Sequence, residues 1–248
     1  MKILRAVTEP VGTALMLSIL LVSCATAVGT SADGTRSRNG GAIPSHDYTL
    51  AFLVAGERAG DLADDVIAAA SLGHRAHIET MGAEGTLLLA GPFGEPRANT
   101  DWRGIYVLDL ADVDAARDLT RSDPSVVAGL FDLVMVPWQC NVDLRPMRDK
   151  LEQEKKAGIP FNPAAYVLAT RKIGPDAAGQ TEHWFGMAGV VCAGELGGGR
   201  DGEIMLLLTA KTVEGATEWL ARHGGADKWE LSSLWATALL GEQAASPR

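Results

Sequence analysis

The chain has 248 residues, with 31 acidic and 22 basic side chains, a formal net charge of −9 and 47% hydrophobic residues. Such an acidic surface repels phosphate backbones and anionic lipid headgroups, and no stripe of lysine and arginine offsets it, so the composition argues against nucleic-acid binding. The apolar fraction is large enough for packed cores, in one large domain or two small ones. We therefore expect a globular protein.

The first 23 residues have the features of a secretory signal. Lys2 and Arg5 precede an apolar stretch that is shorter than the roughly 20 residues a membrane-spanning helix needs. The segment 21–24, Leu-Val-Ser-Cys, resembles the bacterial lipoprotein box in all four positions. The resemblance implies that residues 1–23 are a signal peptide and that lipid on Cys24 holds the protein at a membrane in the bacterial envelope. A plain secretory signal with an incidental cysteine is the alternative.

Ala25 follows the lipidation cysteine directly. By resemblance to Gram-negative lipoproteins, a non-acidic residue at this position implies the periplasmic face of the outer membrane. Residues 24–47 are rich in glycine, serine, threonine and alanine and contain almost no large apolar side chain. This composition predicts a flexible tether between the lipid and the folded part of the protein.

A regular pattern of strands and helices begins at residue 48 and predicts a domain over residues 48–139. Apolar alternation and helical spacing predict strands at 48–54, 86–90, 104–110 and 133–138, and helices at 61–83 and 112–121. The order βαββαβ is that of a ferredoxin-like domain, an antiparallel sheet with both helices on one face.

The pattern recurs more weakly after a connecting helix in residues 140–163. A second ferredoxin-like unit is predicted at 164–240, followed by a tail at 241–248, and the similarity of residues 104–116 to 203–216 indicates a degenerate internal duplication. Each sheet would leave one apolar face uncovered, so we expect the two sheets to cover each other. The expected fold is α+β, with tandem repeats packed as an intramolecular dimeric α+β barrel, and the protein is then a pseudo-dimeric monomer.

Several motifs of the first half lie in register with a known family. They are His74, the segments 85–93, Gly-Thr-Leu-Leu-Leu-Ala-Gly-Pro-Phe, and 122–129, Ser-Asp-Pro-Ser-Val-Val-Ala-Gly, and the tripeptide Val-Pro-Trp at 136–138. Together they resemble the YCII-related (YciI-like) family. The resemblance implies a ferredoxin-like fold, a site formed by a histidine and an aspartate, here His74 and Asp123, and cofactor-independent chemistry of the dehydrochlorinase type.

A histidine beside an aspartate can act as a general acid/base pair. Histidine as a residue type titrates near neutral pH, and a carboxylate orients the imidazole and stabilises its protonated form. Such a pair suits a lyase, isomerase or hydrolase of small organic molecules, with no cofactor. The alternative function is a non-catalytic envelope lipoprotein that binds a ligand or a protein. Asp123 also has a structural interpretation, as the N-cap of a helix that begins with Pro124, and His74 could be a core histidine.

Four further residues are candidates for substrate binding: Gly91, Pro92, Tyr106 and Trp138. Gly91 and Pro92 also suit a strand exit, and Trp138 suits a core or a cavity wall. No direction can be assigned to Tyr106 from the sequence.

Two histidines and two cysteines are candidates for a metal site and a disulfide. His74 and His77 have no third ligand at a recognisable spacing, so no metal site is predicted. An oxidising compartment would permit a disulfide between Cys140 and Cys192, and two separate buried thiols are the alternative.

Overall fold

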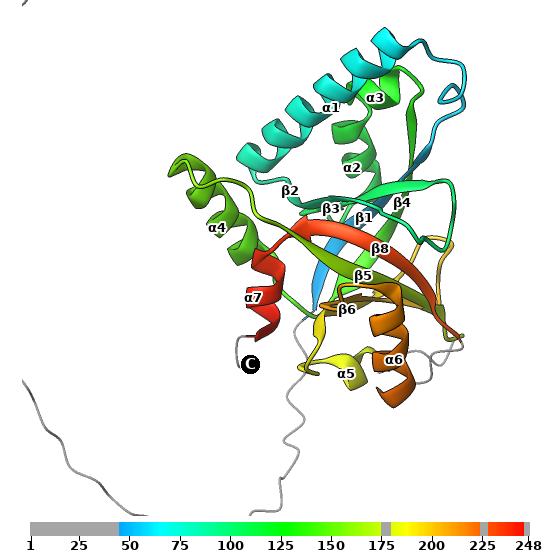
Figure 1. Cartoon of the computed structure of the whole chain (residues 1–248), viewed down its shortest axis with the longest axis vertical. Coiled ribbons are helices and arrows are strands. Elements are labelled where there is room, and N and C mark those ends of the chain that lie inside the picture. The colour runs from blue at the N-terminus through cyan, green and yellow to red at the C-terminus, as the bar shows by residue number, and fades with distance from the viewer. Residues whose placement is uncertain (1–44, 175–179, 224–227, 246–248) are drawn as a thin grey trace, which may run out of the picture. The chain divides into compact units, whose positions relative to one another are not determined.

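Eight strands form one antiparallel sheet in the computed structural model, which describes residues 45–174, 180–223 and 228–245 (Figure 1). The predicted signal peptide, Cys24 and nearly all of the predicted tether lie outside these residues. The first half contains β1 (His46–Ala55), α1 (Asp64–Glu84), β2 (Leu87–Pro92), β3 (Trp102–Leu108), α2 (Val113–Thr120), α3 (Pro124–Val127) and β4 (Phe131–Cys140). After α4 (Arg145–Lys156), the second half contains β5 (Pro163–Lys172), α5 (Gln180–Trp184), β6 (Val190–Leu196), β7 (Glu203–Leu208), α6 (Val213–His223), β8 (Glu230–Thr237) and α7 (Leu239–Ala245).

The strand order is β2-β3-β1-β4-β6-β7-β5-β8, so each half contributes four neighbouring strands in the same relative order. The halves join where β4 pairs with β6, in a register that places Cys140 opposite Gly194. At the other end, β2 approaches β8 through a bridge between Phe93 and Leu234 and a hydrogen bond from the Gly94 N–H to the Ser233 carbonyl oxygen, 2.9 Å. The sheet therefore curls into a nearly closed barrel, and the predicted α+β barrel is confirmed.

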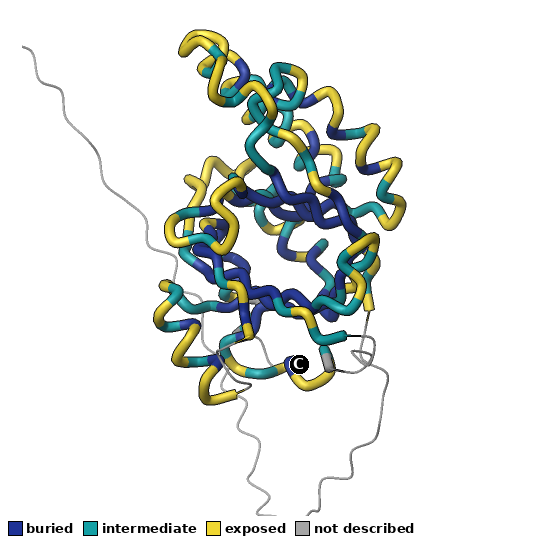
Figure 2. The backbone as a smooth tube through the Cα atoms, turned by 90° about the vertical axis from the view of Figure 1, so that its right-hand side faces the viewer, coloured by how far each residue is buried: buried dark blue, intermediate teal, exposed yellow. Residues whose placement is uncertain are grey.

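The barrel interior is a single apolar core to which both halves contribute. Alternate residues of the strands point inwards, as period-two alternation requires, and Leu50, Trp138, Leu168 and Leu234 are each at most 1% exposed. Figure 2 shows the buried strands curving around this interior, with the more exposed helices outside. The opposite face of the same strands packs under the helices, where Tyr106 and Leu108 contact the layer that contains Met81.

The helices differ from the sequence-based expectations in two places. The predicted connecting helix is confined to α4, which lies beside α7 (Figure 1). Helix α7 was not predicted, and residues 241–245, expected as a tail, lie in it. It forms because Leu239 and Leu240, 6% and 0% exposed, are buried in the barrel core. None of the helices that the structure describes is long and apolar enough to span a membrane.

Candidate active site

The site is built where the short helix α3 docks on α1. A Cβ atom at Gly73 of α1 would lie 2.6 Å from Cγ of Pro124, so the absence of a side chain at Gly73 allows the two helices to touch. The Ser125 hydroxyl then donates to the Ala70 carbonyl oxygen, 3.1 Å away and buried. Because Gly73 and Pro124 are neighbours of His74 and Asp123 in the chain, this contact brings the two predicted site residues together. The sequence analysis did not single out Gly73, although an isolated glycine inside a helical pattern is a signal that could have drawn attention to it.

His74 and Asp123 form a direct pair. The Nδ1 atom of His74 lies 2.7 Å from Oδ2 of Asp123, and the two side chains are 15% and 1% exposed. The other carboxylate oxygen, Oδ1, accepts the N–H of Ser125 at 2.8 Å and so caps α3. The two interpretations of Asp123 are thus compatible, since one oxygen caps the helix and the other holds the histidine.

Tyr106 of β3 completes the group. Its hydroxyl donates to Asp123 Oδ2 over 3.1 Å and lies 3.1 Å from His74 Nδ1, and its ring stacks on the imidazole with centroids 5.9 Å apart. Burial, together with the negative charge of Asp123, raises the pKa of Tyr106 far above its usual range. The phenol therefore stays protonated and acts as a permanent donor to the carboxylate.

The environment of Asp123 keeps it ionised. Burial by itself would raise the pKa of this carboxyl, but the hydrogen bonds from His74, from the Ser125 N–H and from Tyr106 outweigh it, so the pKa lies below its ordinary value. An ionised partner at Nδ1 favours the imidazole tautomer that carries its proton there. The second ring nitrogen, Nε2, lies 3.4 Å from the Tyr106 hydroxyl, at the long limit of a hydrogen bond.

His74 and Tyr106 line a cavity of about 790 Å³, whose lining includes Leu87 from the layer under the helices and Leu88 and Ile105 from the barrel core. Its walls come from α1, β2, β3, α4 and residues 159–161. Most of the lining is apolar, and the volume is in the range that holds a small organic molecule. Gly91 and Pro92, both predicted to bind substrate, also line it.

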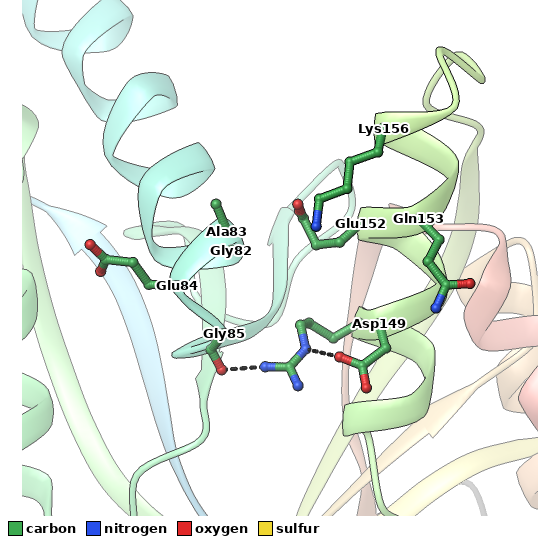
Figure 3. A pocket seen from close by; sticks show the side chains of 9 residues that line it. Gly82, Ala83, Glu84, Gly85, Asp149, Glu152, Gln153 and Lys156 are labelled. Carbon is green, nitrogen blue, oxygen red and sulfur yellow. Dashed lines mark hydrogen bonds and ion pairs between the residues drawn. The ribbon is translucent and has the colours of Figure 1, made fainter.

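A smaller pocket of about 370 Å³ adjoins this cavity between the end of α1 and α4 (Figure 3). Here Arg148 of α4 donates from Nη1 to the Gly85 carbonyl oxygen at 2.5 Å and from Nε to Asp149 at 2.7 Å. Gly82, Arg148 and Glu152 belong to the lining of both pockets. Arg148 thus ties α4 to the C-terminal end of α1 and stabilises one wall of the larger cavity.

Residues 51–139 match the family model of the YCII-related domain, and this range contains His74, Tyr106 and Asp123. The chain contains a YCII-related domain. No curated protein matches the sequence. Among solved structures, the crystal structures of the siroheme decarboxylase NirDL, alone and in complex with an iron-uroporphyrin III analogue, are similar to this chain. Each is 9% identical, covers 79% of this chain and 72% of its own, and has a TM-score of 0.41.

Trp138 lies away from the site of the YCII-related domain. It is 1% exposed, packs in the barrel interior and does not line the cavity. Strand alternation points Trp138 to the inner face of the sheet, whereas Tyr106 points to the outer face, where it contacts His74 and Asp123. The structure thus gives Trp138 a packing position, which corrects its assignment as a substrate-binding residue.

The second half has a different side chain at the position of Tyr106. Tyr106 pairs with Ala51 and Ala90, and Leu206 pairs in the same way with Ala169 and Ala193. Equivalent positions in β3 and β7 are therefore 100 residues apart. The sequence comparison, which aligned residue 104 with residue 203, was out of register by one residue. The ring of Trp184 in α5 packs against those of Trp219 in α6 and Trp229. An apolar cluster thus occupies the layer that holds the His–Asp–Tyr group in the YCII-related domain.

No disulfide joins Cys140 and Cys192, which are both buried in the barrel interior. Cys140 is opposite Gly194 in the register of β4 and β6, so Cys192 is two residues away from the paired position. Such diagonal neighbours are about 7–8 Å apart, beyond the Cβ separation of about 4 Å that a disulfide needs. Among the described residues, no group of three or more histidine, cysteine, aspartate or glutamate side chains could hold a metal ion.

Proposed function

We propose that the YCII-related domain is an acid/base enzyme that acts on a small organic molecule in the 790 Å³ cavity. The observation that carries the proposal is the 2.7 Å contact between His74 Nδ1 and Asp123 Oδ2, with the histidine on the cavity wall and the carboxylate sealed from solvent. A buried, ionised partner at one ring nitrogen orients the imidazole and leaves the other nitrogen for a bound molecule.

In this proposal, Nε2 of His74 takes a proton from a carbon next to an electron-withdrawing group of the substrate. The imidazolium formed in this step is stabilised by the negative charge of Asp123, which Tyr106 holds in place by its hydrogen bond. The electron pair left on the substrate then expels a leaving group, or the proton returns at another carbon. Elimination and isomerisation both follow from this step, and hydrolysis requires the same base to act on water.

We also propose that the enzyme works in the bacterial envelope, tethered through lipid on Cys24 at the periplasmic face of the outer membrane. The Leu-Val-Ser-Cys box at residues 21–24 supports this. Cells grown with radiolabelled palmitate should label the wild-type protein and not the Cys24→Ser variant. A labelled Cys24→Ser protein would refute attachment at this residue.

Exchange of carbon-bound hydrogen in a panel of small molecules tests the chemistry. Small uncharged cyclic ketones, γ-lactones and their chlorinated derivatives are incubated with the protein in D2O, and deuterium uptake and chloride release are followed by NMR and ion chromatography. We expect at least one compound to exchange or lose chloride faster with protein than in buffer.

The second candidate function is non-catalytic ligand binding, which the mostly apolar lining of the cavity also favours. Compounds that shift protein NMR signals of the cavity residues, yet none of which exchanges hydrogen or loses chloride, would favour this binder over the enzyme.

A further inference from the structure

Three residues in the connection between α4 and β5 border the mouth of the cavity. They are Ile159, Pro160 and Phe161, and we call them the 159–161 strap. All three line the cavity, yet Ile159 is 52% and Phe161 is 59% exposed. Two large apolar side chains thus stand in solvent on the rim of an apolar cavity, and a bound molecule would remove part of their surface from water. The strap lies beyond residues 51–139, the part of the chain that matches the YCII-related domain.

Backbone hydrogen bonds hold the strap at both ends. On one side, Gly158 adopts a positive φ of 72° after α4, and the Ile159 N–H donates to the Glu154 carbonyl oxygen over 2.9 Å. On the other side, the Asn162 carbonyl oxygen accepts the Ala238 N–H at 2.9 Å. Since both ends are fixed, the strap presents its apolar side chains at a defined position on the rim.

Most cations of the cavity lining are already engaged by the protein. Arg148 donates to a carbonyl oxygen and to Asp149, and Arg103 donates to the carbonyl oxygens of Thr100 and Trp102 at 2.6 and 3.2 Å. Lys155 lies 3.9 Å from Glu152. With Arg75 these are four cations in the lining, against the three carboxylates of Glu79, Glu152 and Glu154, so the lining carries little net charge to attract an anionic ligand.

The remaining charges lie on the rim, and the inner wall is apolar. Arg75 and Glu79, of opposite sign, are both exposed on the cavity face of α1. The inner part of the lining contains buried apolar side chains, including Leu87, Leu89 and Ile105. An anionic group would be desolvated there without a compensating charge, so the lining fits an uncharged molecule.

We propose that the 159–161 strap is the specificity-determining wall of the site, and that Ile159 and Phe161 contact an uncharged, largely apolar substrate. The proposal rests on the proposed function in that the bound molecule is the one on which His74 acts. The strap, which belongs to the segment that joins the two halves of the chain, selects ligands by apolar contact area.

The test measures binding of N-phenyl-1-naphthylamine, an uncharged probe whose fluorescence rises in apolar surroundings. The Phe161→Gln and Ile159→Gln proteins should bind it at least about tenfold more weakly than the wild type, since each loses apolar contact area. Phe161→Leu should retain most of the affinity. The matched control is Leu72→Gln, because Leu72 of α1 is 63% exposed and does not line the cavity.

Two results of the binding test would overturn the proposal. Absence of saturable binding to the wild type excludes an apolar binding cavity, and equal weakening by Phe161→Gln and Leu72→Gln shows that the probe reports general surface apolarity. The proposed function can fail independently of this proposal. If probe binding depends on the strap but no compound exchanges hydrogen, the strap is a binding wall and the proposed enzyme activity is wrong. If compounds exchange with unchanged KM in Phe161→Gln, the enzyme activity is supported and the role of the strap in specificity is wrong.

Discussion

Replacing His74 by glutamine is expected to lower the rate of carbon-acid exchange by about 10²–10⁴-fold, the contribution of a positioned acid/base group. Glutamine has a similar reach and can still donate to Asp123, but it cannot take up a proton. The loss should therefore fall on kcat, with probe binding and the unfolding transition little changed. Exchange rates measured by NMR for the wild-type and His74→Gln proteins give the ratio.

The matched control for His74→Gln is His77→Gln, the same substitution three residues along α1. His77 does not line the cavity, so exchange should be unaffected. Retention of the wild-type rate in His74→Gln, or an equal loss in His77→Gln, would remove His74 from the chemistry.

The Asp123→Ala substitution is expected to lower the free energy of unfolding by about 3 kcal/mol, because it removes several interactions at once. The cap of α3 is lost, and the buried Tyr106 hydroxyl and His74 Nδ1 lose their acceptor. Urea unfolding followed by circular dichroism measures the change. A loss of this size is a substantial part of the stability of a typical domain.

Asp112→Ala is the matched control, since Asp112 is an exposed N-cap whose side chain accepts the N–H groups of Asp114 and Ala115. Its loss should cost about 1 kcal/mol, the usual value of a cap. Equal effects of Asp112→Ala and Asp123→Ala would show that Asp123 contributes as a cap alone.

The pH dependence of stability independently tests the lowered pKa of Asp123. Because the pKa of Asp123 is lower in the folded protein than in the unfolded chain, its contribution is complete above the unfolded value of about 3.9 and is lost as the pH falls through the folded value. The stability difference between wild type and Asp123→Asn should therefore shrink below about pH 4. A difference that grows in acid would contradict the lowered pKa.

The barrel and the His–Asp pair could be predicted from the sequence for different reasons. Period-two alternation in both halves predicted the strands, and the exposed sheet face left by one half required the other half as its cover. The two site residues came from motifs in register with a known family, and the structure places their side chains 2.7 Å apart. Whether the pair is catalytic stays a prediction.

The remaining features depend on three-dimensional neighbours that local patterns do not report. The opposite directions of Tyr106 and Trp138 follow from strand register, which a sequence without a structure leaves open. Gly73 matters because of its contact with Pro124, 51 positions later in the chain. The 159–161 strap belongs to a connection with no periodicity of its own, so its place on the cavity rim could not be read from composition.

The central claim is that Asp123 holds His74 through Nδ1 and leaves Nε2 for a bound molecule. The ¹⁵N chemical shifts of the His74 ring, measured by two-bond correlation NMR at pH 8, test it most directly. We predict the tautomer with its proton on Nδ1 in the wild type and a shift toward the Nε2 tautomer in Asp123→Asn. A wild-type His74 that carries its proton on Nε2, with no response to Asp123→Asn, would contradict the account.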